Sequence, residues 1–523
     1  MKRILSFLLA LAMTAGFLGG CVIENSEEYV PTGDALVYEG QDPNSVNPTE
    51  DAEIQELVLV YYAEKSMNPL LSGDFTNRVL FSLIYQGLFA VDSDYQAHPM
   101  LCQYYRVSPN TKTWTFYLDP NAIFSDGSRV TVEDVIASYT AAKGSKYYSG
   151  RFTHISSVEA TEDGGIAFLM DTPFENLPLL LDIPIVKAED VDAAHPRGTG
   201  PYVFDQGLSG AQLRRLQNWW CDAQVAATAD SIPLVEAESP SQIRDEFEFY
   251  DVGLVCADPY AHDYADFRGD FELWQVDNGV FLFLACNVAY SNNDIFEDPT
   301  LRSALTYAID RELINEKYYH GFAQPTTLAA SPSSPYYSET LAANYEYDSV
   351  HFISRLNSYG VVKGTLRLLV NKDDIVRLRV ARAIAEMLTE LGLPTETLEK
   401  DSNTFYSYIN NSDYDLYLGQ TRLSPNMDLS AFFNRWGNLS YNGITNLDIY
   451  DLCLGALENH GNYYDLLKTV ADDGRIIPIL FSNHTVFASR GLLSDLSPSR
   501  DNVFFYTRPW TMQDAQLETI YND

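Results

Sequence analysis

The chain has 523 residues, of which 72 are acidic and 34 are Lys or Arg, and its formal net charge is −38. So acidic a surface argues against nucleic acids as partners and against adhesion to anionic lipid headgroups, because both carry negative charge. The length predicts two or three domains with an ample hydrophobic core.

The first residues predict export. Lys2 and Arg3 precede an apolar run, and Leu18-Gly19-Gly20 stands directly before Cys21. This arrangement is typical of a secretory signal, and Leu-Gly-Gly-Cys resembles the lipobox of bacterial lipoproteins, in which the cysteine is acylated and the chain is cut before it. We therefore predict a signal peptide over residues 1–20 and lipidation at Cys21. The alternatives are an ordinary signal peptide with a chance cysteine and an uncleaved membrane helix.

Residues 21–52 predict a flexible acidic tether. Asp and Glu alternate there with Pro31, Pro43 and Pro48, and too few apolar residues are present to order the segment. We expect the tether to hold a folded body at the extracytoplasmic face of a bacterial cell membrane, with the lipid on Cys21 as its anchor. No later stretch is long and apolar enough to cross a bilayer.

The remaining cysteines are widely spaced and contain no Cys-x-x-Cys motif, so metal and redox motifs of that kind are absent from the sequence. Their number is odd, so full internal pairing is impossible. We expect mostly buried free thiols, with one disulfide left open as an alternative. They are Cys102, Cys221, Cys256, Cys286 and Cys453.

Strands and helices alternate in the first half of the body. A continuous apolar run predicts a buried strand over 56–62, and the apolar spacing after Arg78 predicts a helix that ends at the next glycine. Residues 114–118 alternate like a strand. Thr131, followed by two acidic residues in the next turn, predicts the start of a helix over 132–143.

The second half continues the alternation. It predicts a buried strand over 280–286 and a helix over 299–309 that is opened by Asp298-Pro299. A strand–helix–strand unit follows over 365–370, 375–391 and 395–398, and then a short strand over 414–418. The strand–helix–strand unit indicates two parallel strands joined by a crossover helix. The pattern as a whole predicts an α/β protein with mixed sheets.

Several short motifs occur in an order that resembles one family. They are Asn68-Pro69, Tyr85-Gln86-Gly87-Leu88-Phe89, Trp114-Thr115-Phe116-Tyr117-Leu118, Phe124-Ser125-Asp126-Gly127, Gly198-Thr199-Gly200-Pro201-Tyr202, Phe296-Glu297-Asp298-Pro299 and Ala308-Ile309-Asp310-Arg311. Their order is similar to that of the oligopeptide- and dipeptide-binding proteins of ABC importers, solute-binding family 5. The resemblance runs from about residue 54 to residue 515.

The resemblance implies an α/β, two-lobed, periplasmic-binding-protein-like fold of type II, cluster C, with an accessory subdomain and mixed sheets. It implies strands that cross between the lobes near Gly279–Leu282 and Ile477–Phe481, and a ligand enclosed by hinge closure. The implied domains are the first lobe at 53–279 with an accessory subdomain at about 78–190, the second lobe at 280–480, and a return to the first lobe at 481–523.

The resemblance also implies a binding protein rather than an enzyme, with no cofactor and no metal. It would be a lipid-anchored monomer that captures a peptide or peptide-like solute and delivers it to the membrane permease subunits of an ABC importer. The alternatives are a sensing receptor or chaperone of the same fold with a non-peptide, anionic ligand, and, more remotely, a secreted hydrolase. His-Glu-x-x-His and Gly-x-Ser-x-Gly motifs are absent from the sequence.

One segment sets the expected ligand apart from ordinary peptides. Peptide-binding members of the family carry Gly-Trp-Thr-x-Asp, which supplies an aromatic wall and a carboxylate for the peptide ammonium, where this chain has Gly419-Gln420-Thr421-Arg422-Leu423. An arginine attracts a carboxylate and repels an ammonium. Asp428 replaces the missing carboxylate only if the loop runs differently. The ligand-binding candidates here are Gln420, Thr421, Arg422 and Asp428.

The other motifs have mainly structural explanations. Phe124-Ser125-Asp126-Gly127 predicts a tight turn, in which aspartate binds the backbone and glycine adopts a positive φ. Gly-Thr-Gly-Pro-Tyr predicts close approach of two backbones. Gly200, Tyr202 and Asn287 remain additional ligand-binding candidates, because the resemblance places them near the junction of the lobes.

Overall fold

The structure, a computed structural model, describes residues 56–207, 210–249, 251–257, 271–288, 296–360, 362, 364–441 and 443–508. The predicted signal peptide, the lipidation site Cys21 and the acidic tether lie outside these residues. None of the helices in the described part of the chain combines the length and the apolar character needed to span a bilayer.

A seven-stranded mixed sheet, here called the central sheet, forms the middle of the fold. Its order is β11-β17-β12-β16-β14-β15, with β13 paired to β17. The strands are β11 (Leu254–Ala257), β12 (Phe271–Cys286), β13 (Ala323–Pro325), β14 (Leu366–Asn371), β15 (Thr395–Lys400), β16 (Leu416–Arg422) and β17 (Ile476–Ser489).

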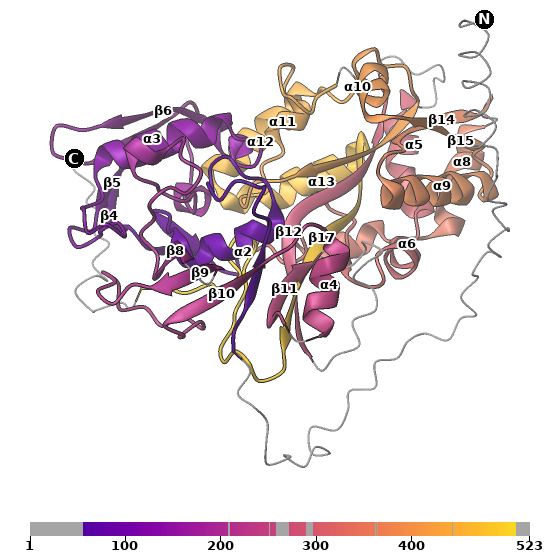
Figure 1. Cartoon of the computed structure of the whole chain (residues 1–523). Helices are drawn as coiled ribbons and strands as arrows, with labels where there is room; N and C mark the ends of the chain where they lie inside the picture. Colours follow the sequence, from indigo (N-terminus) through magenta and orange to yellow (C-terminus); the bar gives the residue numbers. More distant parts are fainter. Residues whose placement is uncertain are drawn as a thin grey trace, which may run out of the picture. The chain divides into compact units, whose positions relative to one another are not determined.

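The two longest strands, β12 and β17, run antiparallel beside each other over almost their whole length (Figure 1). The sequence predicted a strand from Val280 only, and the preceding Asp277-Asn278-Gly279 has the composition of a turn. In the structure these residues form a bulge in a strand that begins at Phe271, and Gly279 adopts a φ of 72° there. The long-range partner β17 therefore overrides the local turn signal.

Helices cover both faces of the central sheet. Successive residues of β12 point to opposite faces, so Phe281 and Phe283 enter one hydrophobic core and Leu282 and Leu284 enter another. The first of these cores takes in α10 (Ser402–Asn410), α11 (Ser430–Phe433), α12 (Leu447–Glu458) and α13 (Tyr463–Asp473). The second takes in α5 (Pro299–Ala304), α6 (Arg311–Tyr318), α8 (Ser349–Tyr359) and α9 (Ile375–Glu390).

The predicted strand–helix–strand unit is confirmed. β14 and β15 are parallel neighbours, and α9 packs on both of them (Figure 1). The helix predicted over 299–309 is shorter than expected, because α5 ends at Ala304 and the chain continues as the 3₁₀ helix η5 (Leu305–Ala308). The last predicted strand is longer than expected, since β16 continues to Arg422.

A four-stranded sheet of order β1-β10-β9-β8 lies in the first half of the chain. It contains β1 (Leu59–Tyr61), β8 (Tyr202–Gly207), β9 (Gly210–Arg215) and β10 (Ser231–Glu236), with α2 (Phe75–Ile84) packed against β1 and β8. Helix α2 begins three residues before Arg78, because the side chain of Asp74 accepts a hydrogen bond from the amide of Asn77 and caps it. Helix α4 (Pro240–Glu248) packs on β11.

A second four-stranded sheet of order β4-β5-β7-β6, here called the accessory sheet, carries α3 (Val132–Gly144) on one side. Its strands are β4 (Cys102–Val107), β5 (Thr113–Leu118), β6 (Ile155–Ala160) and β7 (Ile166–Met170). The remaining described elements are β2 (Phe89–Val91), β3 (Ala97–Pro99), η1 (Ser149–Phe152), η2 (Leu177–Leu180), η3 (Ala188–Asp190), α7 (Glu339–Ala342), η6 (Ala343–Tyr345) and η7 (His460–Asn462).

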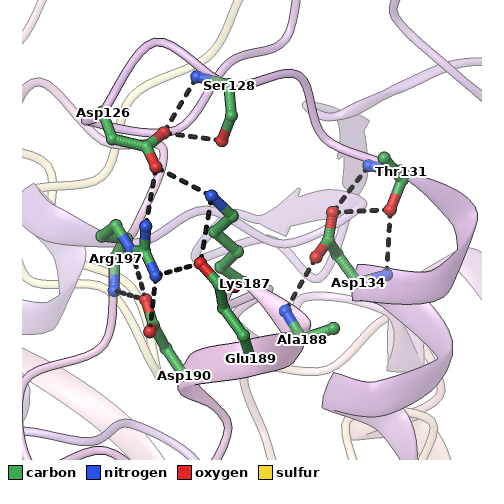
Figure 2. A network of polar contacts seen from close by, with 9 residues as sticks. All are labelled: Asp126, Ser128, Thr131, Asp134, Lys187, Ala188, Glu189, Asp190 and Arg197. Atoms are coloured by element: carbon green, nitrogen blue, oxygen red, sulfur yellow. Dashed lines mark hydrogen bonds and ion pairs between the residues drawn. The ribbon is translucent and has the colours of Figure 1, made fainter.

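Helix α3 begins where the sequence predicted. The amide of Asp134 donates to the hydroxyl of Thr131 over 3.3 Å, and the Asp134 carboxylate accepts from the amide of Thr131 over 2.8 Å (Figure 2). The second oxygen of Asp134 accepts from the amide of Ala188 over 2.7 Å. One carboxylate therefore caps the helix and also fixes the chain that returns past it.

The predicted turn at Asp126 is also confirmed. Gly127 has a φ of 84°, and Asp126 accepts from the amide of Ser128 over 2.8 Å. The other oxygen of Asp126 accepts from Lys187 and from Arg197, each over 2.8 Å (Figure 2). The turn therefore serves as an anchoring point for the segment from 187 to 197 as well as a change of direction.

The five cysteines of the described chain are free and buried, as expected. Burial raises the pKa of each thiol, to about 12 for Cys102 and for Cys286. They therefore pack as small apolar side chains and are poor nucleophiles.

Candidate functional site

The segment that differs from the peptide-binding members of the family lies on a strand. In the pairing of β16 with β12, Gln420 stands opposite Leu282, Thr421 opposite Phe281 and Arg422 opposite Val280. Neighbouring side chains on a strand point to opposite faces. Gln420 is exposed and lines a cavity of about 200 Å³ beside the start of α9. Thr421 therefore points to the opposite face from Gln420, and Arg422, although it lies two residues after Gln420, lines a different cavity.

Thr421, Arg422 and Asp428 line a different cavity, here called the basic cavity, with a volume of about 240 Å³. Its wall comes from three parts of the chain: residues 146–153 around η1, residues 421–439 from the end of β16 to beyond α11, and Arg500. Its charged lining residues are Lys146, Arg151, Arg422, Arg500 and Asp428. Four cations thus face one carboxylate.

Asp501 compensates part of this charge from behind the cavity wall. Its carboxylate oxygens lie 2.8 Å from Arg151 and 2.9 Å from Arg422, and a third arginine, Arg78, is 3.8 Å away. Burial alone would raise the pKa of Asp501, but the surrounding arginines hold it well below the usual carboxyl range. Asp501 is therefore ionised at every physiological pH.

Tyr147 links two of these arginines. Its hydroxyl donates to Asp501 over 2.6 Å, and its ring lies 3.5 Å from the guanidinium of Arg78 and 4.3 Å from that of Arg422. These distances are within the range of cation–π attraction. Arg422 also donates to the carbonyl of Asn278 over 2.9 Å, so its position is fixed without a ligand.

Arg500 is the least compensated cation of the group. Its side chain is 7% exposed, and one of its terminal nitrogens donates to the carbonyl of Leu423, while Nε and the other terminal nitrogen have no hydrogen-bond partner. Its guanidinium lies directly over Gly279, where a Cβ atom would come within 2.1 Å of it. A buried guanidinium with free N–H groups is an effective site for an anion.

A neighbouring imidazole adds no charge to this cluster. His484 is buried, and burial lowers its pKa to about 3, with the nearby arginines acting in the same direction. It is therefore neutral, and the positive charge around the basic cavity belongs to the arginines and Lys146.

Asp428 has partners of its own. His154 lies 3.3 Å from one of its oxygens, and Ser430 donates to the carboxylate from its hydroxyl over 3.0 Å and from its amide over 2.8 Å. Although burial raises the pKa of Asp428, its hydrogen bonds with His154 and Ser430 lower it below the usual carboxyl value. The carboxylate is therefore already engaged by His154 and Ser430, although Asp428 lines the cavity.

Ser430, His154 and Asp171 form a chain of contacts that resembles a hydrolase triad. His154 lies 2.9 Å from the Ser430 hydroxyl and 3.1 Å from Asp171. Ser430, however, is 1% exposed and donates its hydroxyl to Asp428. A substrate has no access to this oxygen, so the arrangement serves as a structural contact.

Gly200 and Tyr202 hold the fold together where they stand. A Cβ atom on Gly200 would lie 2.4 Å from the carbonyl oxygen of Leu83, and the Gly200 amide donates to Ile84 over 2.8 Å. Tyr202 is buried, and its hydroxyl donates to the carbonyl of Ala229 over 2.7 Å. Neither residue lines the basic cavity.

Asn287 also has a fold-related position. It is fully buried at the end of β12, and its side-chain amide donates to the carbonyls of Ser412 and Tyr414 over 3.0 and 2.8 Å. It thereby fixes the approach to β16. Of the ligand-binding candidates, the structure brings together Thr421, Arg422 and Asp428.

Sequence reasoning missed Arg151, Arg500 and Asp501. They belong to η1 and to the segment after β17, and neither segment carries a local motif that links it to β16. No group of three or more His, Cys, Asp and Glu side chains suited to a metal ion occurs among the described residues.

The chain is similar to known proteins in sequence and in fold. The model of the family described as bacterial extracellular solute-binding proteins, family 5 Middle, matches residues 96–443. The glutathione-binding protein GsiB of Salmonella typhi is 22% identical over 361 residues, which cover 64% of this chain and 68% of GsiB.

Two solved structures share the fold. The ABC transporter substrate-binding protein CtaP of Listeria monocytogenes superposes with a TM-score of 0.69 at 18% identity, covering 87% of this chain and 99% of CtaP. The periplasmic murein tripeptide binding protein MppA, in its unliganded open form, superposes with a TM-score of 0.70 at 15% identity, covering 87% of this chain and 98% of MppA. The two-lobed, periplasmic-binding-protein-like α/β fold expected from the sequence is thereby confirmed.

Proposed function

The chain belongs to the bacterial extracellular solute-binding proteins of family 5, and we propose that it captures a small peptide or peptide-like solute that carries an anionic group. Proteins of this family deliver substrates to an ABC importer from outside the cytoplasm.

The excess of positive charge around the basic cavity carries the proposal. Arg78, Arg151, Arg422 and Arg500 are largely buried; in the described part of the chain their ion-pair partners are Asp501 and Asp182, and Asp428 lines the cavity with them. Uncompensated buried charge is costly. A carboxylate from the solute would compensate it, with Arg500 as the first contact because two of its nitrogens are free.

Size and relatives support a short solute. Small-molecule pockets typically have volumes of about 300–1,000 Å³, and the basic cavity has about 240 Å³. The relative GsiB is named for glutathione and the structural neighbour MppA for a murein tripeptide. We therefore favour a solute of one to three residues over a long peptide.

We further propose that the lipid on Cys21 and the tether at 21–52 keep the protein at the outer face of the membrane, where the importer's permease subunits lie. The domain boundaries proposed from the sequence, at 279–280 and 480–481, fall inside β12 and β17. Bending of these two strands, with Gly279 at the bulge of β12, would accompany closure around the solute.

The experiment compares the binding of small peptides that differ in charge. A solute that binds the folded state raises the melting temperature, and at a fixed concentration a tighter-binding solute raises it more. We expect glutathione and acidic di- and tripeptides to raise it, and the same peptides with amidated carboxyl groups to raise it less. If neutral and acidic peptides raise the melting temperature equally, the proposed anionic class of solute is wrong. If no compound in a broad panel of peptides and anionic metabolites raises the melting temperature, solute capture itself is contradicted.

A matched pair of arginine variants tests the site. Arg500→Gln should weaken an acidic solute roughly tenfold or more, because it removes a charged hydrogen-bond partner. Arg382→Gln should leave affinity unchanged, since Arg382 is on the exposed side of α9 and pairs with Glu399. Trp436 is 85% exposed, and Asn438, two residues further on, lines the basic cavity, so tryptophan fluorescence provides the binding signal.

A further inference from the structure

His154 joins two parts of the fold that are distant in sequence. It precedes β6 of the accessory sheet, and its imidazole reaches Asp428 and Ser430 at the start of α11. On its other side Nδ1 lies 3.1 Å from Asp171, which follows β7 of the accessory sheet. The imidazole is 5% exposed and therefore depends on these partners.

The partners around His154 suit its protonated form. A carboxylate only accepts hydrogen bonds, so with Asp171 on one side and Asp428 on the other both ring nitrogens of His154 have to donate. When the ring is neutral, one nitrogen becomes an acceptor, and the single proton of the Ser430 hydroxyl has to serve either His154 or Asp428. Deprotonation therefore costs a hydrogen bond and places a nitrogen lone pair 3.3 Å from a carboxylate oxygen.

We propose that protonated His154 is a positioning residue that ties the accessory sheet to α11 and holds Asp428 against the wall of the basic cavity. Loss of the proton would loosen the tie and leave the Asp428 charge at the cavity without its cationic partner, where it repels an anion. Both effects favour binding at the lower pH. The tie itself does not depend on the identity of the solute.

Among the titratable groups around the tie, His154 is the imidazole whose pKa is raised. Burial lowers its pKa, but the contacts with Asp428 and Asp171 raise it above the ordinary value. The charge of Asp428 also acts on Tyr450 and Cys453 of α12 and on Tyr463 of α13. Burial raises the pKa of each of these groups, so they stay neutral.

A second histidine lies at the same contact. His460 is 3.8 Å from Glu175, and its pKa is lowered, with burial outweighing the effect of that carboxylate. It is therefore already neutral where His154 titrates.

The directions of the pKa shifts of His154 and Asp428 define the pH range in which the tie is stable. A group with a raised pKa contributes fully below its ordinary value, about 6.5 for imidazole, and its contribution is lost as pH rises through the raised value. The pKa of Asp428 is lowered, so the contribution of its carboxylate to the tie is lost only in acid. The tie is therefore strongest in mildly acidic solution and weakens as pH rises through the raised pKa of His154.

Amide hydrogen exchange at Glu175 reports the tie directly. Its amide donates to the carbonyl of Leu457 in α12 over 2.7 Å, and α12 packs on α11, so this hydrogen bond lies beside the tie. In the intact protein we expect its protection, corrected for the intrinsic rate, to fall roughly tenfold between pH 6 and pH 9. In His154→Gln protection should be low at both pH values.

Two further variants make the result decisive. His195→Gln removes an exposed histidine stacked on Phe204 and should keep the wild-type profile. Asp171→Asn keeps the imidazole and should move the midpoint to lower pH, which decides the question even if His154→Gln does not fold. Constant wild-type protection, an unmoved midpoint in Asp171→Asn, or a His154→Gln profile like that of the wild type would each overturn the proposal.

Discussion

Single residues determine the charge balance of the basic cavity. Asp501 sits among three arginines with only 10% of its side chain exposed, and it is the acceptor that Arg151, Arg422 and Tyr147 share. Removing one partner from a buried ion pair is far more destabilising than the pair is stabilising, because the remaining charge is left without compensation.

Asp501→Asn should accordingly lower the free energy of unfolding by about 3–5 kcal/mol. The amide keeps the size of the side chain but loses the charge that the arginines require. Urea unfolding measures the change, and Asp163→Asn is the control, since Asp163 is an exposed carboxylate that also pairs with an arginine and a tyrosine. Equal stability of the two variants would mean that the arginines need no counter-ion.

A glycine is required at position 279 for two reasons: its backbone conformation and the side chain that packs directly against it. Its φ of 72° costs a residue with a Cβ atom about 1–2 kcal/mol, and the Cβ atom would also displace Arg500. Gly164→Ala is a matched control, because Gly164 has a φ of 83° and no atom within 4 Å of the added Cβ. We expect both variants to lose stability in urea unfolding but only Gly279→Ala to lose affinity for an acidic solute.

At the scale of elements, helix caps are among the most predictable features. The sequence predicted α3 from Thr131 and its acidic first turn, and the structure shows the reciprocal hydrogen bonds of a capping box there. The prediction succeeds because every group involved lies within four residues. The beginning of β12 was missed for the opposite reason, since its partner β17 is about two hundred residues away in the chain.

Substitutions in the α3 cap should follow its two functions. Thr131→Ala should cost about 1 kcal/mol of unfolding free energy, the usual effect of losing an N-cap side chain. Asp134→Ala should cost more, about 2–3 kcal/mol, because the amide of Ala188 also loses its acceptor. Thermal or urea unfolding would contradict this assignment if Asp134→Ala were the milder change.

At the scale of the whole molecule, the net charge of the chain is negative, whereas the lining of the basic cavity is mainly positive. The chain carries −38 overall, while four cations line the basic cavity. A distant anionic solute is repelled, and salt screens that long-range repulsion at a Debye length of about 10 Å in 0.1 M salt.

The association rate of an acidic solute should therefore rise as salt increases from about 20 to 200 mM, the reverse of electrostatically steered binding. Stopped-flow fluorescence measures the rate, and a neutral analogue should show no such dependence. A rate that falls with salt would indicate that the local field of the cavity extends into solution.

The family motifs predicted the whole fold better than they predicted the site. They led to the α/β fold, and they directed attention to Arg422 and Asp428, which do line the basic cavity. They gave no sign of Arg500 or Arg151, because the contacts that assemble the cavity join segments hundreds of residues apart. Gly200, Tyr202 and Asn287 stood out for the requirements of packing and hydrogen bonding, which a sequence pattern does not distinguish from ligand contact.

The position of Asp501 has a consequence for how the protein is made. The carboxylate lies 350 residues after Arg151, and Val503 and Phe504 complete the same core that holds β1 and α2. The first core therefore stays incomplete, with its arginines lacking this counter-ion, until almost the last described residues have joined it. A chain that stops before Asp501 lacks both the counter-ion and the apolar side chains of Val503 and Phe504. Premature termination would therefore leave an incompletely packed core that is open to proteolysis.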